Sequence, residues 1–146
     1  MTITSVKSST FLADTIILIR DKLRTNISSA GSRVYTSYPK NPVIYPMITV
    51  IDSGTTQLSK LGMSSEGTLL TITLEIRIWT KSTKERDEMS QEIYEYLRTN
   101  QLDTTTGLKD SGLSGFSLTS MVNVDEIGES GIKSKVMEVQ FLFVCS

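Results

Sequence analysis

The side chains that most often carry catalysis are scarce in this sequence. Histidine, the commonest general base and a frequent metal ligand, does not occur among the 146 residues. The single cysteine, Cys145, has no histidine to activate it, and one cysteine without histidine cannot build a zinc site. We interpret Cys145 as a small apolar residue that completes a strand. The sequence therefore argues against hydrolase and zinc chemistry.

The carboxylates and glycines favour structural roles as well. Glu85, Asp87 and Glu88 stand close together, but acidic residues in the first turn of a helix normally stabilise the helix dipole. Neither the glycine pattern of dinucleotide-binding proteins nor a phosphate-binding Gly-Lys-Ser/Thr loop occurs. We therefore expect no enzymatic activity, no metal site and no cofactor.

The overall charge gives no drive toward nucleic acid or anionic membranes. Fifteen basic and sixteen acidic residues leave a formal net charge of -1. A small basic cluster of Lys81, Lys84 and Arg86 is interleaved with acidic residues, which is typical of a solvated helix start. The apolar run at residues 16–19 is far too short to span a bilayer.

Two segments have helical periodicity. Between residues 10 and 27, the apolar residues recur at intervals of four and three, namely Leu12, Ile16, Ile19, Leu23 and Ile27. A second helix is predicted after Ser82, because residues 82–85 offer a capping box. Its inward stripe consists of Met89, Ile93 and either Tyr96 or Leu97.

The clearest strand covers residues 68–80, where aliphatic and polar side chains alternate. Leu70, Ile72, Leu74, Ile76 and Ile78 fall on one face, opposite Thr71, Thr73, Glu75 and Arg77. A period of two therefore predicts a sheet with one buried face and one face open to water or to a partner.

Shorter runs predict the other strands, at residues 33–36, 47–51, 116–124 and 136–144. In the strand at 116–124, the pattern places Phe116, Leu118, Val122 and Val124 on one face. A single apolar sheet face requires both helices on that side. We therefore predict one α+β domain over residues 1–146, with a mixed, mainly antiparallel sheet of four to five strands and two helices on one face, in the order α-β-β-β-α-β-β.

Two features are candidates for contacts with other proteins. Residues 53–66 are rich in Ser, Thr and Gly and predict a long projecting loop, yet they include the apolar Leu58, Leu61 and Met63. These side chains either meet a partner or fold back on the core. Trp79, the only tryptophan, lies on the polar face of its strand and either packs under the start of the second helix or anchors an interface.

Three stretches of the chain form a further pattern. They are the amphipathic helix at residues 11–27, the strand Arg33-Val34-Tyr35 with Pro46-Met47-Ile48-Thr49-Val50 behind it, and the run Leu74-Glu75-Ile76-Arg77-Ile78-Trp79-Thr80-Lys81-Ser82 that leads into a capped helix. With the closing hairpin, this arrangement resembles the tail terminator, or tail-completion, proteins of long-tailed bacteriophages. The matches are architectural and include no catalytic signature.

The resemblance implies a structural role in the virion after assembly in the host cytoplasm. A hexameric ring would sit on the last ring of the tail tube, stop its growth and offer a surface for joining the head. The implied partners are further copies of the chain, the tail tube protein and the head completion or connector protein. DNA would only pass through the lumen, and no membrane is involved.

Six residues are the candidates for the subunit or tube interface, namely Leu58, Leu61, Met63, Glu75, Arg77 and Trp79. Two other functions stay open. One is a different neck or baseplate component. The other is an α+β module that binds single-stranded nucleic acid on the open sheet face, although the strand at 68–80 offers only Arg77 and Trp79 for this and Glu75 would repel phosphate.

Overall fold

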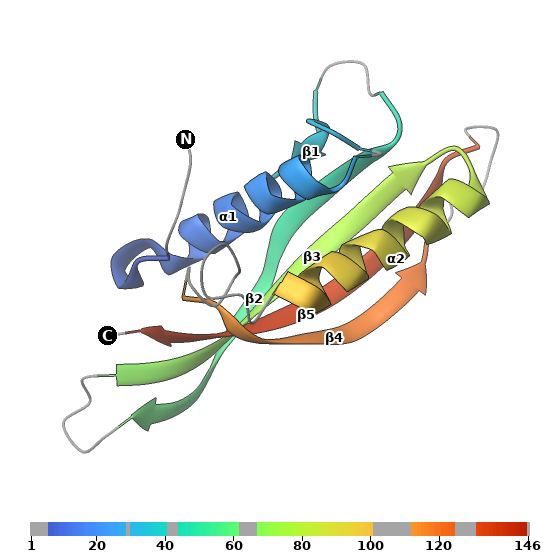
Figure 1. Cartoon of the computed structure of the whole chain (residues 1–146). Helices are drawn as coiled ribbons and strands as arrows, with labels where there is room; N and C mark the ends of the chain where they lie inside the picture. The colour runs from blue at the N-terminus through green and yellow to red at the C-terminus, as the bar shows by residue number, and fades with distance from the viewer. Residues whose placement is uncertain are drawn as a thin grey trace.

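Two long helices and a five-stranded sheet make up most of the described chain (Figure 1). The computed structural model describes residues 6–28, 30–40, 44–61, 67–100, 112–124 and 131–145. Along the chain the elements are η1 (Ser8–Thr10), α1 (Phe11–Asn26), β1 (Val34–Tyr35), β2 (Met47–Leu61), β3 (Gly67–Thr80), α2 (Thr83–Asn100), β4 (Ser114–Asn123) and β5 (Lys133–Cys145).

The sheet has the strand order β1-β2-β3-β5-β4. The short β1 runs parallel to β2, and all other neighbouring strands are antiparallel. Although β5 follows every other described strand in the sequence, it lies between β3 and β4 in the sheet. The predicted fold class, including the number of strands and their order along the chain, is confirmed.

Both helices cover the same face of the sheet, as predicted (Figure 1). Helix α1 contacts β1 and β2, whereas α2 contacts β3, β4 and β5. We call this side the helix face and the opposite side the outer face. The core on the helix face contains, among others, Leu18, Ile19 and Leu23 of α1, Ile72, Leu74, Ile76 and Ile78 of β3, Met89, Ile93 and Leu97 of α2, and Met137, Val139 and Phe141 of β5.

The inward stripe of α1 differs from the prediction at its first position. Leu12 is 38% exposed, whereas Leu18, which the predicted stripe omitted, is buried. The buried Thr15 also faces the core, and its hydroxyl donates a hydrogen bond to the Phe11 carbonyl oxygen at 2.6 Å, so burial leaves this group satisfied. In α2, Leu97 rather than Tyr96 completes the stripe. Neither described helix combines the length and apolar composition that crossing a membrane requires.

Strand β2 is much longer than predicted. The prediction ended this strand at residue 51 and assigned residues 53–66 to a projecting loop, but the strand continues to Leu61. It pairs with β3 from Met47, opposite Trp79, to Leu61, opposite Gly67. The outer ends of β2 and β3 extend beyond the helices in Figure 1. We call residues 55–61 and 67–71 the hairpin arm.

Two register shifts explain why the sequence pattern does not reveal the second half of β2. The register of β2 against β3 shifts between Asp52 and Gly54 and again between Gln57 and Ser59. Each shift adds a residue to β2 and interrupts the alternation of faces on which strand prediction relies. Without a constant period of two, the polar composition reads as a loop.

A similar shift corrects the prediction for β4. Leu118 pairs with Val139 on the helix face, but Val122 pairs with Val136 on the outer face and is 55% exposed. A register shift between Leu118 and Ser120 inserts one residue and reverses the alternation. The prediction that Val122 shares the buried face of Phe116 and Leu118 is therefore wrong.

Candidate interaction surfaces

The outer face of the sheet is covered by neither of the two described long helices and mixes apolar with charged side chains. Exposed large apolar side chains on its described strands include Ile51 on β2, Val122 on β4 and Val144 on β5. Glu75, Arg77 and Trp79 lie in one row along β3, because residues two apart in a strand share a face. The structure thus brings these three predicted interface residues together.

Trp79 is buried, with 9% of its surface exposed, and its neighbours come from distant parts of the chain. Its indole Nε1 donates a hydrogen bond to the Thr49 hydroxyl at 3.2 Å. The ring of Tyr38 meets it edge to face, with 5.3 Å between centroids. Trp79 is therefore packed by its own chain, but under Tyr38 on the outer face rather than beneath α2.

Arg77 is held against the same tryptophan. Its guanidinium carbon lies 4.0 Å from the centre of the Trp79 ring, which is cation–π geometry. Its Nη2 donates to the Ser134 hydroxyl at 3.1 Å, and its buried Nε meets no acceptor among the described residues. The side chain is thus fixed in position while one donor stays unused.

Two carboxylates face each other beside this cluster. Glu75 of β3 and Glu138 of β5 are cross-strand partners on the outer face, and both are half-buried. Like charges directly opposite each other in a sheet are destabilising. Ser53 donates a long hydrogen bond of 3.5 Å to Glu138. The centre of the outer face is therefore locally negative.

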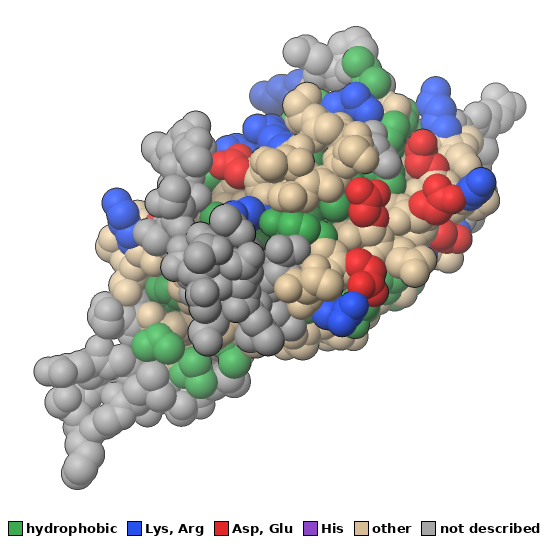
Figure 2. All heavy atoms as spheres, viewed as in Figure 1, with side chains coloured by type: hydrophobic (Ala, Val, Ile, Leu, Met, Phe, Trp, Pro, Cys, Tyr) green, Lys and Arg blue, Asp and Glu red, His purple; other side chains and the backbone are tan. Residues whose placement is uncertain are grey.

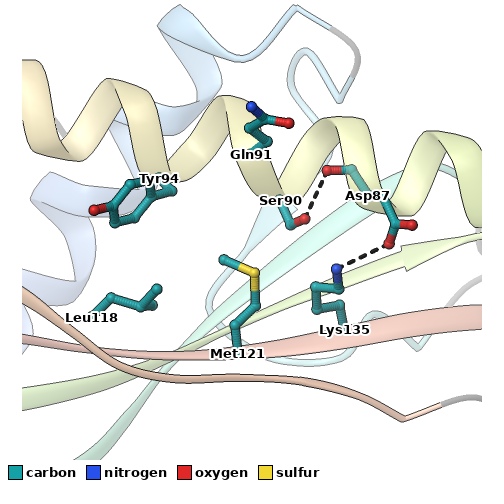
Figure 3. A pocket seen from close by; sticks show the side chains of 7 residues that line it. All are labelled: Asp87, Ser90, Gln91, Tyr94, Leu118, Met121 and Lys135. Carbon is teal, nitrogen blue, oxygen red and sulfur yellow. Dashed lines mark hydrogen bonds and ion pairs between the residues drawn. The ribbon is translucent and has the colours of Figure 1, made fainter.

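A groove of about 410 Å³ lies on the helix face, between α2 and the edge strand β4. Figure 3 shows its lining residues, which are Asp87, Ser90, Gln91, Tyr94, Leu118, Met121 and Lys135. Its floor is apolar, and its one carboxylate and one amine are already joined, with Lys135 Nζ 2.9 Å from Asp87 Oδ1. The groove suits a side chain of a partner better than a reaction.

The ion pair at the groove favours the ionised form of Asp87. Lys135 donates to the carboxylate, and Arg86 donates to the same oxygen through Nε at 3.1 Å. These two hydrogen bonds hold the pKa of Asp87 below its ordinary value. The pair joins the start of α2 to β5, since Lys135 belongs to that strand.

We expect Asp87→Asn to lower the melting temperature near neutral pH and to have no effect in acid. A carboxyl whose pKa is lower in the folded state stabilises the fold above its unfolded pKa and loses this contribution as pH falls through the folded pKa. The difference in melting temperature between the variant and the parent should narrow as the pH falls below about 4, the ordinary pKa of an aspartate, and should close once the Asp87 carboxyl of the folded parent is protonated. Thermal melts followed by circular dichroism from neutral to acid pH measure this difference in melting temperature.

Glu88→Gln is the matched control. Glu88 pairs with Lys84 at 3.8 Å, and both side chains are mostly exposed, so this pair contributes little. If Asp87→Asn still melted at a lower temperature than the parent in acid, the role of the Asp87 charge would be contradicted.

The hairpin arm contains two of the other predicted interface residues. Leu58 and Leu61 belong to β2, although their side chains lie outside the described part of the structure. Met63 lies outside the described residues altogether. Sequence reasoning missed Tyr38, Thr49 and Ser134, which surround Trp79 and Arg77, because no local pattern links residues so far apart in the chain.

Comparisons with known proteins find likeness among solved structures. No protein-family model matches the chain, and no curated protein matches it. Among solved structures, a chain from the virion of a native gene transfer agent (GTA) particle superposes with a TM-score of 0.62. The two chains share one fold. The match covers 86% of this chain and 91% of the virion chain at 11% sequence identity, so the shared feature is the fold itself.

Proposed function

We propose that this chain is a structural virion protein that forms a ring, hexameric by its resemblance to tail terminators, at the head-proximal end of a phage tail tube. There it ends tube polymerisation and provides the surface on which the head joins the tail. Its partners are further copies of itself, the tail tube protein and the head completion or connector protein. It acts without a cofactor and without catalysis.

The observation that carries this proposal is the shared fold with a virion chain. The likeness spans nearly all of both chains, so it concerns the whole domain rather than a common helix or hairpin. The tail terminator resemblance rests on other grounds, namely the order and capping of the helices and strands in the sequence. Both lines favour a building block of a particle.

The shape of the molecule supports assembly through unlike surfaces. A closed ring needs a heterologous contact, in which one patch of each copy meets a different patch of the next. We propose that the outer face around Glu75, Arg77 and Trp79 and the hairpin arm, with Leu58, Leu61 and Met63, contact neighbouring copies or the tail tube. Trp79 itself is mostly buried, so it contributes to this surface by holding the exposed Tyr38 in place.

The electrostatics of the outer face weaken the nucleic-acid alternative. Binding of single strands needs exposed aromatic rings and cations along the sheet. Here Glu75 and Glu138 occupy the centre of the face, and the guanidinium of Arg77 lies over the Trp79 ring. A phosphate backbone would meet two carboxylates at that point.

The test uses the purified chain and tail tubes assembled from the tube protein encoded near it. Native mass spectrometry is expected to give a single ring mass, with a hexamer predominant, either alone or after addition of tubes. Electron microscopy of labelled protein is expected to place it at one end of each tube. Tube length in assembly reactions should fall as the chain is added.

Monomers that ignore tail tubes in both measurements would overturn the proposal. Label at the opposite end of the tail, or at a site away from the tube terminus, would favour another neck or baseplate component. Binding to single-stranded DNA that weakens steeply with salt, without any ring, would support the nucleic-acid module instead.

A further inference from the structure

Among the described residues, the sheet has two free edges, and they are unlike. At one side, β1 covers only Ile48 and Thr49 of β2, so residues 50–61 have no partner strand on that edge among the described residues. At the other side, β4 ends the sheet. An unpaired edge presents a row of N–H and C=O groups that can bind another strand.

Neither edge has the composition or the short length that usually prevents such pairing. Natural edge strands are protected by prolines, charges, very short length or β-bulges, and of these the register shifts are present, two in β2 and two in β4. Strand β4 has ten residues and contains no proline and no charged side chain. Residues 50–61 contain no proline and only two charged residues, Asp52 and Lys60. Both edges are therefore suited to strand addition.

The directions of the two edges also fit each other. Successive pairs from β2 through β3 and β5 to β4 are antiparallel, so β2 and β4 of one copy run in opposite directions. When a second copy continues the sheet in the same orientation, its β2 runs antiparallel to β4 of the first copy. The contact joins unlike edges and can be repeated until a ring closes.

We infer that copies of this chain join edge to edge, with β4 of one copy pairing with residues 50–61 of the next in a continuous antiparallel sheet. This inference rests on the proposed ring and names the contact that builds it. Ile51 and Val122 are exposed β-branched residues on the outer face, one at each edge. Setting them opposite each other uses nearly all of β4 and forms an apolar cross-strand pair.

The charges of the two sides are complementary. Residues 7–40, which contain α1 and β1, include six basic and two acidic residues, a net charge of +4. Helix α2, over residues 83–100, includes three basic and five acidic residues, a net charge of −2. Figure 2 shows acidic side chains gathered over α2 and mostly basic ones over α1. Because both helices lie on the helix face, edge pairing brings α2 of one copy beside α1 of the next.

The groove between α2 and β4 lies at the same margin. A strand added to β4 would direct its helix-face side chains toward the groove, as in peptide recognition by strand addition. On β2 these include Thr55 and Gln57, which pair with core residues of β3 yet are exposed in the single chain. The groove thus receives side chains that the isolated chain leaves in water.

Disulfide trapping tests the register. In a Cys145→Ser background, the double variant Ile51→Cys/Val122→Cys is expected to give, under mild oxidation, a ladder of covalent multimers that ends at the ring size. Each single-cysteine variant should stay uncross-linked. The control pair Ile51→Cys/Val144→Cys, which is equally exposed but places its second cysteine on an interior strand, should stay uncross-linked as well.

A pair of introduced charges gives an independent test of the contact. Val122→Glu alone is expected to lower the assembled fraction at least tenfold, and Ile51→Lys in the same chain should restore it by forming a pair across the contact. The parent protein, measured by native mass spectrometry, is the reference for both variants.

The outcomes separate this inference from the proposed function. A parent that forms rings while the double-cysteine variant does not cross-link overturns edge pairing and leaves the ring intact. Dimers from Val122→Cys alone would show two β4 strands meeting symmetrically, which also overturns it. A parent protein that stays monomeric with and without tail tubes overturns both the edge pairing and the proposed ring.

Discussion

Replacing Phe141 with alanine is expected to lower the free energy of unfolding by about 3–5 kcal/mol. Phe141 is fully buried on β5, between β3 and β4, and its ring centre lies 5.6 Å from that of Phe116. Removing the ring leaves a cavity where the central strands and α2 converge. Because domains of this kind are stable by only about 5–15 kcal/mol, the loss is a large share of the total.

Urea denaturation at a concentration where the chain is monomeric measures this effect. Val144→Ala on the same strand is the control, because Val144 is 50% exposed on the outer face and its truncation should cost less than about 0.5 kcal/mol. Equal effects of the two substitutions would contradict the assignment of Phe141 to the core.

Replacing Trp79 with alanine is expected to cost about 3 kcal/mol or more, even though the residue lies outside the main core. The ring packs under Tyr38, holds the Arg77 guanidinium and donates to Thr49. Trp79→Phe keeps most of the volume but leaves the buried Thr49 hydroxyl without its donor, so it should cost about 1–2 kcal/mol.

Far-UV circular dichroism follows these variants, because they remove the only tryptophan. Tyr38→Ala provides the comparison: Tyr38 is 51% exposed, and its loss should cost only about 1 kcal/mol from the edge-to-face contact. If Trp79→Ala proved no more costly than Tyr38→Ala, the ring would not be the centre of this cluster.

The parts of the fold that sequence predicts are those with an uninterrupted period. Five aliphatic residues alternate through β3, and α2 repeats its stripe at Met89, Ile93 and Leu97, so both elements and their buried faces were evident. Of the two hydrogen bonds of the predicted capping box, the structure shows the one in which the Glu85 amide donates to the Ser82 hydroxyl, at 3.5 Å. From these patterns alone, the single helix-covered face follows.

The two errors in the predicted strands share one physical cause. Register shifts in β2 and β4 add residues that a periodic pattern cannot anticipate, so residues 53–61 read as a loop and Val122 as a core residue. The row formed by Glu75, Arg77 and Trp79 was predictable from the alternation. Its surroundings were not, because Tyr38 and Ser134 reach it only through the folded topology.

The position of β5 in the sheet has a consequence for synthesis on the ribosome. This strand follows all other described strands in sequence, yet it separates β3 from β4. Until β5 emerges, one edge of β3 is unpaired and β4 has no neighbouring strand. The nascent chain therefore exposes more unpaired strand edges than the complete fold does. Translation that stopped before Lys133 would leave a product prone to aggregate rather than a smaller working domain.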